Sequence, residues 1–235
     1  MILFRNDDVL ALDKPAGVSM ATSAREPAGR AVERLLAACG LPADDALLLV
    51  HRLDVYTSGA VLLARNPAAH RALSLAFQER RVAKTYRAVV WGRPRPAAGV
   101  IDAPLSRDPK DGRKMRVTPD GKPAVTRYVT RHVATSITDL ALQPETGRTH
   151  QIRVHLASKG HPIVGDDFYG GATRWRGVKD PAWRRLLREV TRPLLHAERV
   201  TVPELGLDVE APLPDDYARI LALLTISSAG PPRHA

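Results

Sequence analysis

The alternation of apolar and polar residues predicts several short strands. Two strands are expected within residues 2–12, on either side of an Asn-Asp-Asp turn. Apolar or alternating runs predict further strands at 46–50, 60–64, 84–91, 124–133 and 137–143. Residues 104–123 are rich in proline, glycine and charge, which indicates a long loop or an extended hairpin.

Apolar residues spaced by three and four positions predict helices between these strands. Their start and stop signals are Gly40 as a C-terminal cap, Asn66-Pro67 as a start, Thr149 as an N-cap with Gly160 as a stop, and Asp180-Pro181 as a start. The helices are expected at 29–39, 67–80, 150–159, after Pro181 and after Pro214. Short strands mixed with scattered helices favour an α+β fold over a regular βαβ series.

The composition indicates a globular chain with an excess of positive charge. Of 235 residues, 44% are hydrophobic and 26% charged, and the net charge is +10. Such a surplus favours a polyanionic partner, first of all a nucleic acid. Two segments concentrate it: 105–131 carries eight basic and three acidic residues, and 174–192 adds seven basic residues beside Trp175.

Other features set the expected compartment. With Cys39 as the one cysteine, the chain is expected to form no internal disulfide and no cysteine-built zinc site. No apolar run reaches the roughly 20 residues that cross a bilayer, and the start does not resemble a signal peptide. We therefore expect a cytoplasmic protein without a membrane partner, in which residues 227–235 form a disordered tail.

Several common kinds of site have no support. Neither a GxGxxG motif nor a Walker loop is present, so a nucleotide cofactor is not expected. His150 and His155 lack the four-residue spacing of a helical zinc pair, and Ser58 is not in a G-x-S-x-G elbow. No metal site is predicted.

Two polar segments remain as candidates for chemistry. The segment 51–59, HRLDVYTSG, places Asp54 in a loop between two apolar strands; its simplest interpretation is a solvated turn in which Asp54 accepts backbone N–H bonds. The segment 145–155 gathers two arginines, two histidines and a glutamine at a helix start, which is either a solvated basic surface or a site for an anion.

Together these segments resemble the RluA family of RNA pseudouridine synthases. HRLDVYTSG is similar to that family's catalytic motif, and TGRTHQIRVH with GHPIVGDDFYG is similar to its second signature. KPAG at 14–17, KTYRA at 84–88, LHA at 195–197 and APLP at 211–214 match smaller landmarks in the expected order. The resemblance implies a pseudouridine synthase-like fold over residues 1–226, with a mixed, mostly antiparallel sheet, flanking helices and loops around a catalytic cleft.

The resemblance also implies a reaction and its residues. Uridine is isomerised to pseudouridine in structured ribosomal or transfer RNA, a change that needs no cofactor. Asp54 matches the catalytic aspartate, Tyr86 the tyrosine that stacks on the base and accepts a proton, and Arg153 the arginine that pairs with the aspartate. The target must be flipped out of its stack, and Arg52 is expected to enter the space it leaves.

RNA binding is predicted for residues near these motifs and in the first basic segment. They are His51, Arg52, Thr57, Arg107, Lys114, Arg116, Arg148, His150 and Gln151. Many family members carry an additional RNA-binding module of the S4 type, and none is expected here. A monomer that finds an RNA stem-loop through its catalytic domain is expected.

Two other interpretations are kept beside this one. A non-catalytic RNA-binding or assembly protein with the same fold would be favoured by loss of Asp54, which is present. A glycoside-cleaving hydrolase would release free uracil and would need a second carboxylate, for which Asp166 or Asp167 is available.

Overall fold

The computed structural model describes residues 1–22, 27–134 and 136–228. The chain divides into two compact units. Unit 1 consists of Met1–Tyr86 and His196–Pro212, and unit 2 consists of Arg87–Leu195 and Leu213–Ala235. The catalytic domain expected over 1–226 includes residues of both units, and its extent stays a prediction.

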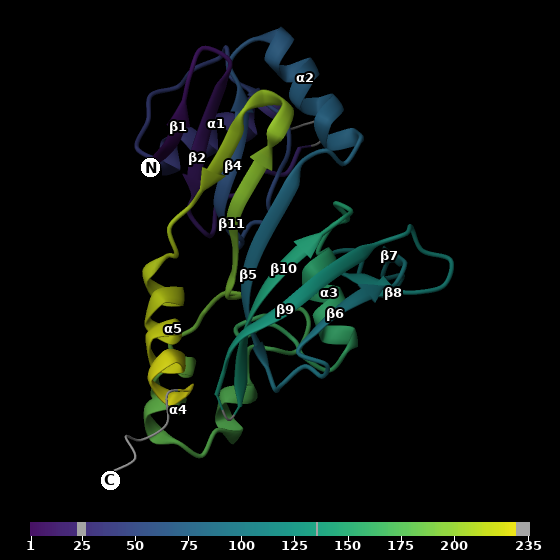
Figure 1. Ribbon diagram of the computed structural model, residues 1–235, viewed down its shortest axis with the longest axis vertical. Helices are drawn as coiled ribbons and strands as arrows, with labels where there is room; N and C mark the ends of the chain where they lie inside the picture. The colour runs from purple at the N-terminus through teal and green to yellow at the C-terminus, as the bar shows by residue number, and fades with distance from the viewer. Residues whose placement is uncertain (23–26, 135, 229–235) are drawn as a thin grey trace. The chain divides into compact units, whose positions relative to one another are not determined.

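The sheet of unit 1 is mostly antiparallel (Figure 1). Its strand order is β1-β2-β4-β11, with β12 added beside β11 and β3 beside β4. β4 and β11 run parallel, while the pairs β1–β2, β2–β4, β3–β4 and β11–β12 are antiparallel. The strands are β1 (Ile2–Arg5), β2 (Val9–Lys14), β3 (Leu48–Leu49), β4 (Ser58–Ala64), β11 (Leu195–Val202) and β12 (Leu207–Glu210).

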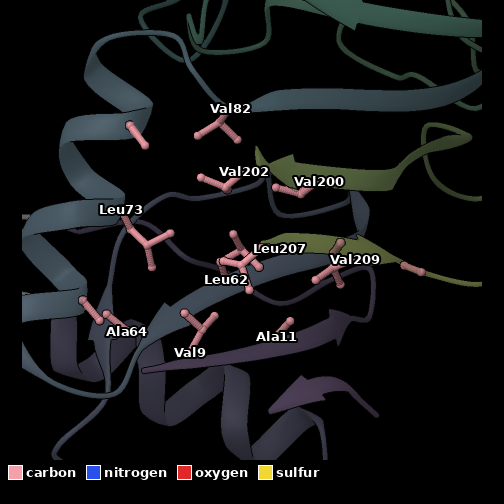
Figure 2. Packing of buried hydrophobic residues seen from close by; sticks show 14 residues of the cluster. Val9, Ala11, Leu62, Ala64, Leu73, Val82, Val200, Val202, Leu207 and Val209 are labelled. Atoms are coloured by element: carbon pink, nitrogen blue, oxygen red, sulfur yellow. The ribbon is translucent and has the colours of Figure 1, made fainter. Parts of the chain in front are cut away.

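Helices cover both faces of β4, which is buried along its whole length. Alternate residues of a strand point to opposite faces, so Leu62 packs with Leu73 of α2 (Pro67–Gln78) in one apolar cluster (Figure 2). On the other face, Leu63 packs with Leu35 of α1 (Ala28–Ala38). Burial on both sides explains why this segment reads as a continuous apolar run.

Local signals in unit 1 work largely as predicted. Asn66 caps α2, because its Oδ1 accepts a hydrogen bond from the Ala69 N–H at 2.8 Å. Gly40 has a φ of 70° just after α1, as expected for a helix stop. α2 ends at Gln78 rather than near Arg80, which has a φ of 60°.

Unit 2 has the strand order β5-β10-β9-β6 and a separate hairpin of β7 and β8 (Figure 1). β9 pairs antiparallel with both β10 and β6. The predicted strands at 124–133 and 137–143 are confirmed, and the segment 104–123 contains the hairpin. The strands are β5 (Ala83–Trp91), β6 (Ala98–Asp102), β7 (Leu105–Arg107), β8 (Met115–Val117), β9 (Val125–Val133) and β10 (Ile137–Pro144). The first residues of β5, up to Tyr86, belong to unit 1.

Four helical segments accompany these strands. Asp180 caps α4 as predicted, accepting from the Trp183 N–H at 3.0 Å. The expected tail is helical as far as Ser228, and the rest of it, 229–235, lies outside the described residues. The helices are α3 (Gln151–Ser158), α4 (Pro181–Arg188) and α5 (Asp215–Ser228), with a 3₁₀ turn, η1 (Arg174–Gly177).

The predicted cap of α3 is wrong. The helix begins at Gln151, and the preceding residue is His150, with a φ of 54° and no capping side-chain bond. The left-handed conformation of His150 separates Thr149 from the helix, so its hydroxyl does not cap it. Instead, the side chain of Gln151 accepts from the Arg148 N–H at 3.0 Å.

A buried polar network joins β5, β10 and α5 within unit 2. Arg87 forms an ion pair with Asp139, which is completely buried. The Tyr217 hydroxyl donates to the same carboxylate at 2.7 Å, and His132 Nδ1 lies 3.1 Å from it. A buried carboxylate needs such partners, since an isolated charge in the interior is strongly destabilising.

Candidate active site

The loop 51–57 of unit 1 carries Asp54 between β3 and β4. Leu53 is buried, Asp54 is half-buried and Arg52 is exposed. The carbonyl of Asp54 accepts from the N–H of Thr57 at 3.1 Å and closes a turn. The loop is therefore anchored by Leu53 while the Asp54 side chain stays near the surface.

Lys14 binds the backbone of this loop through hydrogen bonds. Its side chain has 0% relative exposure, and its Nζ donates to the carbonyls of Val55 at 3.0 Å and Thr57 at 2.8 Å. A third bond goes to the carbonyl of Pro15 at 3.1 Å. A buried ammonium group needs acceptors for its protons, and the loop backbone supplies them.

Gly17 supports the same turn from the backbone. Its N–H donates to the carbonyl of Val55 at 2.8 Å, and its φ is 90°. This conformation costs little for glycine and is rare for other residues. The KPAG segment thus contributes both a lysine and a glycine to the support of the loop.

His51 fixes the start of the loop. Its Nε2 accepts a hydrogen bond from the Leu62 N–H at 2.9 Å, and its ring stacks on Phe77 with centroids 4.6 Å apart. Burial, followed by the positive charge of Lys84, lowers the pKa of His51 to about 3. The ring is therefore neutral at physiological pH, which favours a positioning role over a contact with a phosphate.

Replacing His51 with glutamine is expected to flatten the acid dependence of stability. Because the folded pKa is below the unfolded value of 6.5, the unfolded chain binds more protons between pH 6.5 and pH 3. The free energy of unfolding therefore decreases as the pH is lowered through this window, by up to about 1.4 kcal/mol per pH unit for this proton.

Denaturant unfolding from pH 7 to pH 4 measures this slope for both proteins. His155, whose pKa is also lowered by burial, contributes equally to both, and its part cancels in the difference. Equal slopes for the wild type and His51→Gln would contradict the assignment.

Tyr86 of β5 lies in the electrostatic range of Asp54. Its ring is half-buried and packs against the cluster that contains Leu53. Burial and then the negative charge of Asp54 raise the pKa of the Tyr86 hydroxyl. The phenol therefore keeps its proton at neutral pH. Stacking of its ring on a base needs no change in this protonation state.

The end of the loop is fixed to β11. The side chains of Ser58 and His196 are buried, and Ser58 Oγ lies 2.9 Å from Nδ1 of His196. His196 Nε2 lies 3.2 Å from the carbonyl of Ala211, so this nitrogen carries the proton of the neutral ring and Nδ1 accepts from Ser58. A Cβ on Gly59 would lie 2.2 Å from the Ala197 oxygen, so only glycine permits this close approach.

In unit 2, Arg153 of α3 is held by Asp166. Arg153 Nε donates to Oδ2 at 2.7 Å and a terminal nitrogen donates to Oδ1 at 2.9 Å. Asp166 is completely buried and also accepts from the Phe168 N–H at 3.1 Å. The predicted pairing of Arg153 with Asp54 would join residues of the two units and stays a prediction.

Two aromatic rings lie beside the Arg153 guanidinium. Its carbon is 5.1 Å from the centroid of Tyr169 and 5.5 Å from that of Phe168. The basic groups of Arg113 and Lys114 also face Phe168, at 5.6 and 5.7 Å. Three cations around one ring form a surface suited to an anion that carries a flat group, such as a nucleotide.

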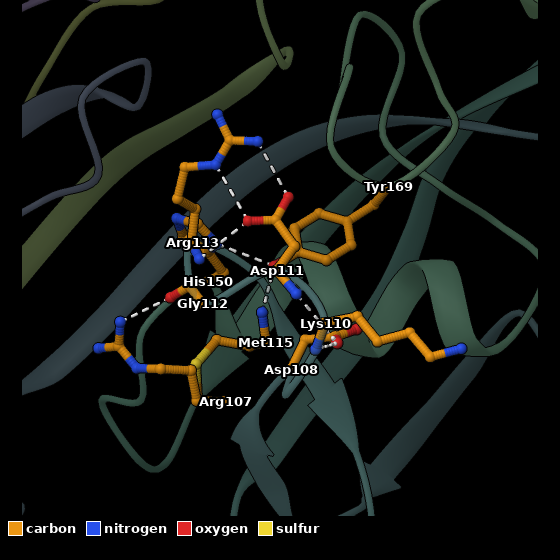
Figure 3. A network of polar contacts seen from close by, with 9 residues as sticks. All are labelled: Arg107, Asp108, Lys110, Asp111, Gly112, Arg113, Met115, His150 and Tyr169. Carbon is orange, nitrogen blue, oxygen red and sulfur yellow. Dashed lines mark hydrogen bonds and ion pairs between the residues drawn. The ribbon is translucent and has the colours of Figure 1, made fainter.

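Tyr169 connects this ring cluster to the hairpin of β7 and β8 (Figure 3). Its hydroxyl accepts from the Met115 N–H at 3.0 Å and lies 2.9 Å from Nδ1 of His150. His150 is thereby fixed against the hairpin, and its unusual backbone conformation follows from this position.

The tip of the hairpin is ordered by its own charges (Figure 3). Asp111 binds the guanidinium of Arg113 through two bonds of 3.0 Å, which lower the pKa of Asp111 to about 2. Arg107 donates to the Gly112 carbonyl at 2.6 Å. These contacts give the tip a fixed shape while its arginines stay at the surface.

Gln151 is an internal residue of unit 2. It is 4% exposed, and its amide nitrogen donates to the Val125 carbonyl at 2.9 Å and to Thr126 Oγ1 at 3.0 Å. Its amide oxygen accepts from Thr146 Oγ1 at 2.6 Å as well as from the Arg148 N–H. This bonding favours a role in shaping the loop 146–150 rather than direct contact with RNA.

The remaining residues predicted to bind RNA differ in exposure. Arg52, Arg107 and Arg116 are exposed. Lys114, Arg148 and His150 are half-buried, and Thr57 is buried.

Three residues that shape the site had no role predicted from the sequence: Lys14, Phe168 and Tyr169. Asp166 was considered only as the second carboxylate of a hydrolase, not as the partner of Arg153. Each of the four belongs to a motif quoted for the resemblance. The aromatic pair in a polar segment is the signal that could have identified Phe168 and Tyr169.

Two kinds of feature have no counterpart in the described residues. No three histidine, cysteine, aspartate or glutamate side chains gather there closely enough to hold a metal ion. None of the helices in the same ranges combines the length and apolar character of a bilayer-spanning segment.

Comparison with known proteins identifies the family. The model of RNA pseudouridylate synthases matches residues 8–158. "Ribosomal large subunit pseudouridine synthase D" of Xanthomonas campestris is 41% identical over 234 residues, covering 97% of this chain and 70% of the relative. "Uncharacterized RNA pseudouridine synthase YjbO" of Bacillus subtilis is 36% identical over 227 residues, covering 94% and 75%.

A solved structure supports the same assignment. The structure named "Human RNA Pseudouridylate Synthase Domain Containing 4" has a TM-score of 0.72 at 28% identity and covers 95% of this chain and 92% of its own. The expected fold class, the isomerase activity and the resemblance are thereby confirmed. The chain belongs to the RluA family of RNA pseudouridylate synthases.

Proposed function

We propose that this pseudouridine synthase acts on structured ribosomal RNA, with Asp54 as its catalytic carboxylate. The observation that carries the proposal is the support of the loop 51–57 by Lys14 and Gly17. Asp54 in this loop is half-buried, and its charge acts on Tyr86. The choice of ribosomal RNA rests on the relative that is 41% identical and named for the large ribosomal subunit.

The reaction fits a carboxylate held in this way. The N1–C1′ bond of uridine breaks, the base rotates and a C5–C1′ bond forms, while C5 loses a proton and N1 gains one. A carboxylate oxygen of Asp54 acts on the sugar or the base during bond exchange. Fixing the loop backbone limits the positions of Asp54, which favours reaction when the base is bound.

Tyr86 is proposed to stack on the target base and to take part in removing the C5 proton. A hydroxyl that keeps its own proton accepts another only if it passes the first one on. The raised pKa of Tyr86 therefore makes a proton relay the consistent form of this role.

Arg153 and Arg52 are proposed to act when the RNA is bound. Arg153, oriented by Asp166, is the predicted ion-pair partner of Asp54. Arg52 is exposed beside Asp54 and is proposed to fill the space left by the flipped base.

The hairpin and the ring cluster are proposed to hold the RNA around its target. Phe168 offers a stacking surface, and the cations that face it can neutralise phosphates. The residues with predicted RNA contacts Arg107, Lys114, Arg116, Arg148 and His150 all belong to unit 2.

The hydrolase alternative loses support at its second carboxylate. Asp166 accepts hydrogen bonds from Arg153 with both oxygens, an arrangement that serves to orient the arginine. Asp167 is exposed. Appearance of free uracil during the reaction would favour the hydrolase.

The proposed setting is a monomer in the cytoplasm, where bacterial ribosomes are assembled; the relatives described above with this activity include bacterial proteins. Light scattering of the purified protein is expected to give the mass of one chain.

Mapping of modified sites tests the proposed substrate. We expect deletion of the gene to remove at least one pseudouridine from large-subunit ribosomal RNA, and the purified wild type to restore it on RNA from the deletion strain. Loss of a site in transfer RNA instead would identify that class as the substrate. An unchanged map of both classes would contradict the proposal.

A further inference from the structure

We propose that a second RNA-binding surface lies on η1 and α4 of unit 2 and binds the phosphate backbone of the stem beside the target. We name it the Trp175 surface; it consists of Trp175, Arg176, Lys179, Arg184, Arg185 and Arg188. The inference rests on the proposed function, since it assumes a structured RNA substrate.

The charges of this surface are unbalanced. Residues 174–188 contain six basic residues and one acidic residue, Asp180, whose side chain caps α4. Within the described residues, no acidic side chain pairs with any of the five cations of the Trp175 surface. All five are exposed.

Three exposed arginines elsewhere in the chain show the contrast. Arg127 pairs with Glu145, Arg199 with Asp208 and Arg219 with Glu189. Such pairs are the usual arrangement of a solvated surface with mixed charge. The Trp175 surface lacks such pairs, which leaves five neighbouring cations available to an external anion.

Two of these cations lie against the ring of Trp175. The guanidinium carbons of Arg176 and Arg188 lie 5.7 and 6.0 Å from its ring centroid. The negative end of the helix dipole stabilises Arg185 and Arg188 in the last turn of α4, but it does not account for Arg176, Lys179 and Arg184. Crowding like charges around a ring is unfavourable without an anion and becomes favourable with a polyphosphate.

The position of the surface indicates which part of an RNA it contacts. α4 and the hairpin of β7 and β8 lie at opposite ends of unit 2 (Figure 1). An RNA that contacts both must extend along unit 2 from the hairpin to α4. The stem next to the target loop has the regular phosphate spacing that scattered arginines recognise without reading sequence.

The test compares Lys179→Gln/Arg185→Gln with a control, Arg5→Gln/Arg71→Gln, that removes the same charge from exposed positions of unit 1. Within the described residues, neither Lys179 nor Arg185 forms a side-chain hydrogen bond or an ion pair, so the double substitution is expected to leave folding unchanged. The probe is the ribosomal fragment that the wild type modifies, with its full stem or shortened to the target loop.

We expect the first variant to bind the full-stem RNA roughly tenfold more weakly at low salt, and the slope of log K against log salt to decrease by about 1 to 2. The maximal rate is expected to stay at the wild-type value, and the shortened RNA to bind both proteins equally. The control variant is expected to match the wild type within about twofold. RNA is also expected to protect the half-buried Trp175 from a fluorescence quencher, a signal lost in Trp175→Phe.

The inference would be overturned if Lys179→Gln/Arg185→Gln and the control variant bound the full-stem RNA with the same affinity and the same salt slope. Turnover by the wild type would in that case leave the proposed function intact. Binding of vesicles rich in phosphatidylserine that the first variant loses, with RNA binding unchanged, would also overturn the inference and assign the surface to a membrane. Failure of the wild type to modify any RNA would instead count against the proposed function.

Discussion

Asp54→Asn is expected to abolish pseudouridine formation, lowering the rate by roughly 10⁴-fold or more, the scale seen when a catalytic nucleophile or its carboxylate is removed. Asparagine has nearly the shape of aspartate but lacks the negative charge that acts on the nucleotide. The loop is held through the carbonyls of Val55 and Thr57 and through His51, not through the Asp54 side chain alone. The variant is therefore expected to fold like the wild type. Its affinity for RNA is expected to stay within about twofold of the wild-type value.

Release of tritium from RNA that contains 5-tritiated uridine measures the reaction directly, because C5 loses its hydrogen during isomerisation. Gel-shift titration of the same RNA measures binding. Asp45→Asn, an exposed position of the same unit, is the matched control and is expected to react at the wild-type rate. Turnover by Asp54→Asn near the wild-type rate would remove Asp54 from the chemistry.

The elements of the fold were predictable where a local signal determines them. Asn66-Pro67 and Asp180-Pro181 start α2 and α4 because a cap needs only a side chain and the N–H three residues later. Thr149 satisfied the same sequence rule and failed, because the backbone of His150 turns left-handed to reach Tyr169 across 19 residues. A local rule fails when a distant contact decides the conformation.

The site likewise combines residues that are contiguous in the sequence with contacts between residues far apart in it. The segment 51–59 was identified because its functional residues are contiguous. The bonds from Lys14 to Val55 and Thr57 cross 41 and 43 residues, and no spacing within a motif indicates them. Gln151 and His51 show the opposite case: polar residues within a functional motif whose hydrogen bonds go to the protein interior.

Support of the loop by Lys14 is expected to matter almost as much as the carboxylate. In Lys14→Met, the carbonyls of Pro15, Val55 and Thr57 lose the ammonium group as hydrogen-bond donor. We expect the free energy of unfolding to fall by about 1–3 kcal/mol, since the Thr57 carbonyl is left buried without this donor, whereas the Val55 carbonyl keeps the Gly17 N–H. We also expect the rate at saturating RNA to fall roughly 10²-fold, because small displacements of a catalytic group have effects of this size.

The separation of these two effects tests whether Lys14 positions Asp54 or only stabilises the fold. Activity is measured well below the melting temperature of the variant, where a purely structural loss would leave the folded enzyme at its full rate. RNA affinity is expected to persist, because Lys14 is buried and most of the proposed contacts with RNA lie in unit 2. Lys159→Met removes an exposed lysine and is expected to keep both stability and rate. A full rate in folded Lys14→Met would mean that the turn at Asp54–Thr57 and Gly17 hold the carboxylate in place by themselves.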